Sequence, residues 1–250
     1  MIFKIAWHEC RKLFLSPLAW TLMAALQFIL AWFFFSLIDQ FFSLQPQLAV
    51  IENAPGASDL IVAPLFNTAS VLLLMICPIL TMRLLAEEYR SGSINLLLSS
   101  PISMTEIILG KYFGIVLFLF IIILQISIMP LSLLLGTDLD TSKLAAGILA
   151  LLLLVAAFAA AGIYLSSLTD NPSVAAISTF GLLIMLWIID SAAGNNGDKS
   201  EFFSYLSLLQ HNLPMLRGII NTEDISYYLL FILLFITLSI RQLDKQRLQN

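Results

Sequence analysis

The chain has 250 residues, of which 60% are hydrophobic and only 11% are charged. A soluble domain is roughly 45–50% apolar and roughly 25% charged, so this composition excludes an ordinary water-soluble protein. The formal net charge is −4, and no basic cluster interleaved with aromatics points to nucleic acid as a partner. The two cysteines, Cys10 and Cys77, lie far apart, which gives neither a disulfide framework nor a metal-binding spacing.

Six apolar segments dominate the chain, and each is long enough to cross a bilayer. Backbone groups find no water in lipid, so each segment is expected to be helical. The sequence therefore predicts an all-α integral membrane protein, with a transmembrane domain over residues 15–250. The predicted spans cover residues 17–38, 60–82, 107–135, 144–168, 172–190 and 225–241.

The N-terminal residues 1–14 are predicted to form a cytoplasmic interfacial segment. They mix apolar side chains with Lys4, Arg11 and Lys12, a composition that suits a short helix lying in the membrane interface. A plain basic anchor is the alternative. The first span is too long for the core of a signal peptide and no cleavage site follows it, so we expect it to be retained.

The basic residues indicate the orientation when loops are assigned alternately to the two sides. Of 12 Lys and Arg residues, Lys143, Lys199 and Arg217 fall on one side and all others on the opposite side. The positive-inside rule then places both termini in the cytoplasm. We expect a multi-pass protein of the cell membrane, which in a bacterium is the inner membrane.

The inner loop 83–106 carries helix boundary signals. Arg83 and Glu87 are four residues apart, so a charged turn can prolong the second span into the cytoplasm. Gly92 can end that helix in the left-handed conformation. A new helix can start at Ser103, with Glu106 completing a capping box before the third span.

The same loop contains an apolar run that is too short to cross a membrane. Leu96, Leu97 and Leu98 form this run, and Pro101 follows it. An apolar surface of this kind must be covered by lipid or by a protein groove.

The run EEYRSGSINLLLSSPIS at residues 87–103 resembles the cytoplasmic loop of type-2 ABC transporter permeases. The resemblance is closest to small six-span permeases grouped with gliding-motility transporters, and it continues to Glu106 and the Gly-Lys pair at 110–111. Residues 168–172 and 216–224 are similar to two further segments of that family. The chain departs from the pattern at Ser93, where Thr is usual, and at Asn95, where Glu is common.

This resemblance implies a type-2 ABC exporter permease fold, a second permease chain, identical or related, and a cytoplasmic ATPase that binds ATP and Mg. An auxiliary protein on the outer side is also compatible with it. Loop 83–106 would be the coupling element, with leucines making the ATPase contact and charges at its rim; a solvated face is the alternative for any single charge. The residues assigned to this element are Glu87, Glu88, Arg90, Gly92, Leu96, Leu97, Leu98, Pro101 and Glu106.

Catalytic chemistry is not expected in this chain. No Gly-x-x-x-x-Gly-Lys-[Ser/Thr] motif is present to cradle phosphates. His8 and His211 have no Ser, Cys or carboxylate at a spacing typical of a catalytic pair, and His211 is expected to be a surface residue. We therefore predict no catalytic residue, cofactor or metal in the chain itself.

Polar residues inside the spans should face protein or water, because an unpaired polar group in hydrocarbon is costly. They can line a substrate pathway or simply bond to neighbouring helices. The pathway candidates are Gln27, Asn67, Gln125 and Ser127.

The outer loop 191–224 contains apolar residues at helical spacing, which predicts a short amphipathic helix over 201–218. Pro214 is expected to bend or end this helix, and Gly218 to turn the chain back toward the sixth span. By comparison with the resembled family, Phe202, Phe203 and Leu206 are candidates for an outer gate.

Three other function classes remain open at this level. A non-transporting membrane scaffold fits the composition. A membrane-embedded enzyme fits less well, because the spans are nearly free of ionisable groups. A proton- or sodium-driven transporter would place an acidic residue at mid-membrane, whereas Asp39 and Asp190 lie at span ends.

Overall fold

The computed structural model describes residues 1–48, 55–94, 102–136, 139–193 and 205–249. Every regular element within these ranges is helical, so the all-α prediction is confirmed. In chain order the elements are α1 (Ile2–Leu15), α2 (Pro17–Leu48), the π-helical turn η1 (Ser58–Val62), α3 (Ala63–Thr81), α4 (Ala86–Ser91), α6 (Met104–Ser132), the 3₁₀ turn η2 (Leu133–Leu135), α7 (Thr141–Ser166), α8 (Pro172–Ala193), α10 (Leu208–Leu216) and α11 (Thr222–Gln249).

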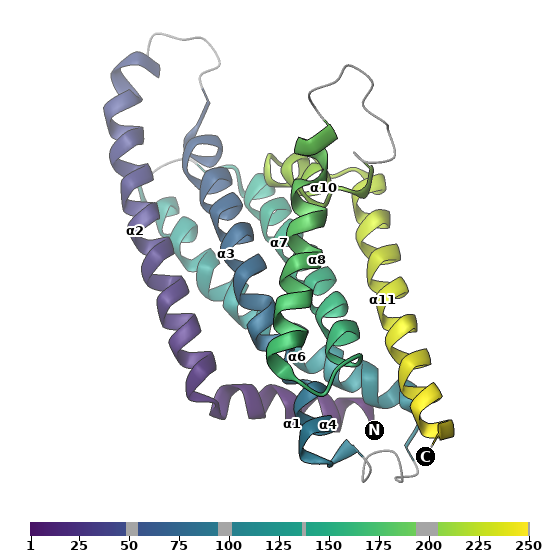
Figure 1. Cartoon of the computed structure of the whole chain (residues 1–250). Coiled ribbons are helices and arrows are strands. Elements are labelled where there is room, and N and C mark those ends of the chain that lie inside the picture. The colour runs from purple at the N-terminus through teal and green to yellow at the C-terminus, as the bar shows by residue number, and fades with distance from the viewer. Residues whose placement is uncertain (49–54, 95–101, 137–138, 194–204, 250) are drawn as a thin grey trace.

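Six helices are long and apolar enough to cross a membrane, which confirms the predicted number. They are α2, α3, α6, α7, α8 and α11, and they run side by side as a bundle (Figure 1). Both chain termini lie at one end of this bundle, the termini end, and α1 lies across it. The short helix α10 lies at the opposite end.

Two spans are longer as helices than their apolar segments suggest. Helix α2 continues past residue 38 to Leu48, and α11 continues past residue 241 to Gln249. Both extensions are more polar than the spans, but neither contains a glycine, and Pro46 lies only in the last turn of α2. Hydropathy marks where lipid ends, whereas helix termination requires a breaker or a cap.

Helix α3 does not continue into α4, so the expectation that a helical turn prolongs the second span without a break is wrong. Helix α3 ends at Thr81 and a turn over residues 82–85 precedes α4. The Ser166 hydroxyl of α7 stabilises the break, because it accepts hydrogen bonds from the backbone N–H groups of Leu85 (3.1 Å) and Ala86 (3.0 Å). The same hydroxyl donates to the Met82 carbonyl at 3.0 Å. Backbone groups that a continuous helix would pair are thus paired by a side chain.

Helix α7 is the central element of the bundle and packs against α3, α6, α8, α10 and α11. Its second half is a run of small residues from Ala156 to Gly162, most of them fully buried. Small side chains let helices approach closely in a membrane, where packing replaces the hydrophobic effect as the driving force.

The contact of α1 with α6 depends on two glycines. A Cβ atom on Gly110 would lie 2.7 Å from the Ile5 Cβ, and one on Gly114 would lie 2.8 Å from the Ala6 carbonyl oxygen. Residues 110 and 114 are one helical turn apart, so together they form a flat strip on α6 that receives α1.

Replacing Gly114 with Ala should destabilise the protein, because the new methyl group would meet backbone that cannot easily move. We expect a cost of about 1–3 kcal/mol, measured as a lower melting temperature in detergent. Gly181→Ala in α8 is the matched control, since a Cβ there meets nothing within 4 Å. The control should be neutral or slightly stabilising. Equal effects of the two substitutions would contradict the role given to Gly114.

Candidate functional site

A buried lysine joins three helices at the termini end. Lys111 of α6 is 1% exposed, and its Nζ donates to Glu9 Oε1 of α1 at 2.7 Å and to Glu88 Oε1 of α4 at 2.6 Å. Helices α1, α4 and α6 therefore meet at one ammonium group. We call Glu9, Lys111 and Glu88 the ion triad.

Separating the three charges of the ion triad would cost free energy. Removing a charged group from water costs several kcal/mol, and only well-placed opposite charges offset that cost. Glu9 is also buried, and Glu88 Oε2 is buried with no hydrogen-bond partner among the described residues. Moving α4 away from α6 would leave Lys111 with one carboxylate instead of two.

The charges predicted at the rim of the coupling loop divide into two groups. Glu88 points inward to Lys111, whereas Glu87 and Arg90 are exposed. One signal for the triad was present in the sequence, because Lys111 lies inside the predicted third span. An ionisable residue within a span requires a partner, but the sequence does not identify which one.

Two helix boundaries within loop 83–106 are as predicted. Gly92 caps α4 with φ 73° and ψ 0°, in the left-handed region. The Ser103 hydroxyl accepts from the Glu106 N–H at 3.2 Å, and the Glu106 carboxylate accepts from the Ser103 N–H at 3.4 Å. The capping box is therefore confirmed. Leu96, Leu97, Leu98 and Pro101 lie outside the described residues.

A second contact holds α4 from another side. The Tyr89 hydroxyl donates a hydrogen bond to Gln246 Oε1, which lies in the extension of α11 beyond the sixth predicted span. Helix α4 is thus tied to α6 by charge and to α11 by a neutral hydrogen bond.

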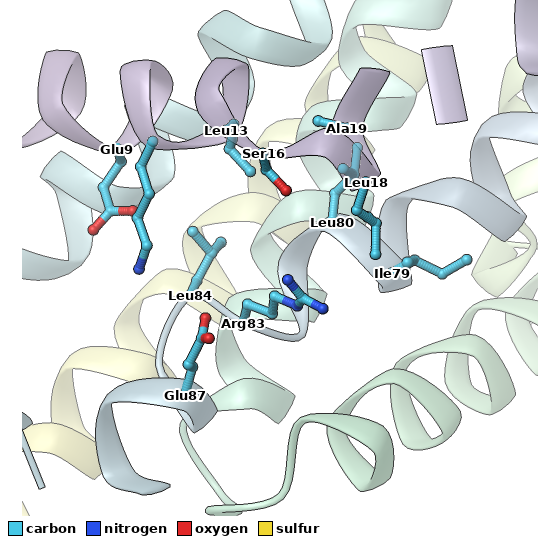
Figure 2. A pocket seen from close by; sticks show the side chains of 11 residues that line it. Glu9, Leu13, Ser16, Leu18, Ala19, Ile79, Leu80, Arg83, Leu84 and Glu87 are labelled. Carbon is cyan, nitrogen blue, oxygen red and sulfur yellow. The ribbon is translucent and has the colours of Figure 1, made fainter. Parts of the chain in front are cut away.

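Next to the ion triad, a cavity of about 140 Å³ lies between the α1–α2 bend and the 82–85 turn (Figure 2). Arg83 and Glu87 face it from one side, and Glu9 and Ser16 from the other. Its lining carries charges of both signs, so it favours neither an anion nor a cation. No cluster of His, Cys, Asp or Glu suited to a metal occurs in the part of the chain that the structure describes.

The four pathway candidates lie on three different helices. Gln27, Asn67 and Gln125 are half-buried, whereas Ser127 is buried and its hydroxyl donates to the Ile123 carbonyl at 2.8 Å. Asn67 lines a cavity of about 370 Å³ at the end of the bundle opposite the termini.

Of the helix predicted over 201–218, the described residues show α10 over Leu208–Leu216. Helix α10 starts after Ser207, whose hydroxyl accepts from the Gln210 N–H, and it includes Pro214 without ending there. Gly218 then reverses the chain with φ 88°, as expected. Leu206 is half-buried before α10, while Phe202 and Phe203 lie outside the described residues.

His211 is buried, so its expected place on the surface is wrong. Its side chain packs against α11, with Nδ1 2.7 Å from Asp224 Oδ1 and the ring stacked on Tyr227 at 4.1 Å. Its Nε2 lies 3.0 Å from the Tyr205 carbonyl, which can only accept, so Nε2 donates. The turn at Gly218 brings Asp224 back to α10, and local spacing does not reveal that.

Two further hydrogen bonds anchor α10. The Asn212 side chain donates to the Ser70 hydroxyl of α3 at 3.1 Å, and the Tyr228 hydroxyl donates to the Leu208 carbonyl at 3.1 Å. The outer segment is therefore fixed to both the second and the sixth span.

Comparison with known families identifies the chain over nearly its whole length. Residues 3–248 match the model of a family described as ABC-2 family transporter protein. The match runs from α1 to α11, so it includes the ion triad and the outer segment. No curated protein matches the chain.

Replacing Lys111 with Met should be strongly destabilising, because two carboxylates would stay buried without a cation. We expect a loss of about 3–5 kcal/mol, read from thermal unfolding in detergent. Lys143→Met is the control, since the Lys143–Asp59 pair (2.8 Å) is about one-third exposed. That exposed pair should contribute only about 0–1 kcal/mol.

A triple variant tests whether charge is the cause. Combining Lys111→Met with Glu9→Gln and Glu88→Gln removes the uncompensated carboxylates and should recover much of the lost stability. If the triple variant were no more stable than Lys111→Met alone, packing of the lysine stem rather than its charge would explain the loss.

Proposed function

The chain belongs to the ABC-2 family of transporter proteins and is a membrane permease of an ABC transporter, and we propose that it exports its substrate with a separate cytoplasmic ATPase. The division of labour is supported by the absence of a P-loop motif from the sequence. ATP and Mg²⁺ would bind to the partner subunit. Within the family, the residues 87–103 favour the small permeases grouped with gliding-motility transporters.

The observation that carries this proposal is the ion triad. A coupling element must be firmly connected to the spans, since a loose loop cannot transmit displacement. Helix α4 meets that requirement through Glu88, which pairs with Lys111, and through Tyr89, which bonds to α11. Its exposed charges, Glu87 and Arg90, can meet an ATPase. The leucine run 96–98, which lies outside the described residues, is proposed on sequence alone to supply the apolar part of that contact.

The proposed mechanism follows from these connections. ATP binding to the ATPase displaces α4, and Lys111 passes the displacement to α6 and α1. Because α1 leads directly into α2, the first and third spans respond together. A second permease chain would provide the other wall of the substrate pathway, and the half-buried amides Gln27, Asn67 and Gln125 are candidates for its lining.

The opposite end is proposed to form the outer gate. Leu206 precedes α10, whose anchoring to α3 and α11 would hold it near the mouth of the pathway. Phe202 and Phe203, which lie outside the described residues, are proposed for the same gate on sequence alone. An auxiliary outer-side protein could bind at this end. Both termini would then lie in the cytoplasm of a bacterium, with the protein in the inner membrane; nine of the 12 Lys and Arg residues support this orientation.

Replacing Leu97 with Asp should weaken the complex with the ATPase, because a charge would occupy the apolar contact. We expect at least about a tenfold loss of ATPase that copurifies with the permease, while the chain still inserts. Leu135→Asp is the control, because Leu135 is 94% exposed at the opposite end of the bundle. An equal loss in both variants, or no copurifying ATPase with the unchanged chain, would count against the coupling role. The second result would favour a scaffold.

The orientation can be tested with single cysteines in a background lacking Cys10 and Cys77. Ser93→Cys should react with a membrane-impermeant thiol reagent only after the cytoplasmic side is opened, and Ser142→Cys should react in intact cells. The two serines lie at opposite ends of the bundle. The reverse labelling pattern would overturn the topology and with it the coupling role.

A further inference from the structure

Helix α1 presents an unpaired basic face. At about 100° per residue, Lys4 and Arg11 fall on the side opposite Glu9, the residue that pairs with Lys111, and His8 lies at the margin of that side. The side chains of Lys4, Arg11 and Lys12 form no ion pair or hydrogen bond with any residue that the structure describes. Glu9, the one acidic residue of this helix, pairs with Lys111. No acidic side chain of α1 is therefore left to neutralise its basic residues.

An apolar groove of about 900 Å³ lies beside this face, between α1 and α6. Phe3 is 92% exposed, Trp7 67% and Phe113 49%, and all three line the groove. Lys4 lies at its edge. The volume is near the upper end of the roughly 300–1,000 Å³ range of small-molecule sites.

The acidic residue at the groove, Glu106, does not cancel the basic face. Its carboxylate accepts from the Ser103 backbone and lies 3.9 Å from the N-terminal amine of Met1. A groove with aromatic walls and a cationic edge matches a molecule that has an apolar chain and an anionic head.

The position of α1 identifies the source of such a molecule. The helix lies across the ends of the spans (Figure 1), and in a bilayer that these spans cross, their ends lie where lipid headgroups meet water. Tryptophan is enriched at this level of a membrane, and basic residues there attract anionic lipids. The same chemistry on a second copy of this chain would need an acidic surface to meet Lys4 and Arg11.

We propose that α1 and the groove form a binding site for an anionic phospholipid. An acyl chain lies in the groove against Phe3, Trp7 and Phe113, and the phosphodiester is held by the basic face through Lys4 and Arg11. The site fixes α1 at the membrane surface from the side opposite the ion triad.

Native mass spectrometry of the full chain in detergent tests the proposal, with phosphatidylglycerol and phosphatidylcholine of identical acyl chains as probes. The unchanged protein should retain phosphatidylglycerol at least about tenfold more strongly than phosphatidylcholine. The variant Lys4→Gln/Arg11→Gln should lose most of that preference. The control Lys245→Gln/Arg247→Gln removes the same charge from exposed positions of α11 and should keep it.

Two results would overturn the site. One is a preference that is absent from the unchanged protein or lost equally in the variant and the control. The other comes from a photo-crosslinking amino acid at Phe3, which should label lipid in phosphatidylglycerol vesicles. Crosslinking mainly to a second copy of the chain would make the groove a subunit interface instead.

Discussion

The burial of Lys111 constrains the whole termini end of the molecule. A buried ammonium must keep its carboxylates, because leaving one charge unpaired costs several kcal/mol. Its partners lie 102 and 23 residues away in the sequence, so one atom fixes two otherwise independent segments. Gly110 and Gly114 make the pairing possible, since side chains there would hold α1 too far away for Glu9 to reach. Close packing and charge pairing therefore depend on each other.

The short helices α4 and α10 follow the same structural plan at opposite ends of the bundle. Neither spans the membrane, and each is held to the spans by polar groups that are largely shielded from water. Glu88 connects α4 to the third span, and His211 connects α10 to the sixth through Asp224. Under the proposed function, α4 would meet the ATPase and α10 would lie at the outer gate, and both roles require such fixed attachments to the spans.

Local signals made the spans and the loop boundaries predictable. Hydropathy gives the six spans, and Gly92 and the Ser103–Glu106 capping box act within a few residues of themselves. The ion triad and the Ser166 contacts join residues far apart in sequence, and one sequence alone contains no record of such pairings. Glu87 and Glu88 show why one sequence does not reveal such pairings. They are adjacent and chemically alike, yet a helix turns them about 100° apart, one toward solvent and the other toward Lys111.

The turn over residues 82–85 separates α4 from α3, so α4 can change its angle without being a continuation of the second span. A push on a continuous helix would travel along its axis into α3. Here the hydroxyl of Ser166 in α7 holds the junction through hydrogen bonds to the backbone. The side chains of α4 bond instead to α6 and α11. A rotation of α4 would break none of the hydrogen bonds within α3. If α4 is the coupling element proposed above, α3 can therefore keep its own hydrogen bonds while the neighbouring helices move.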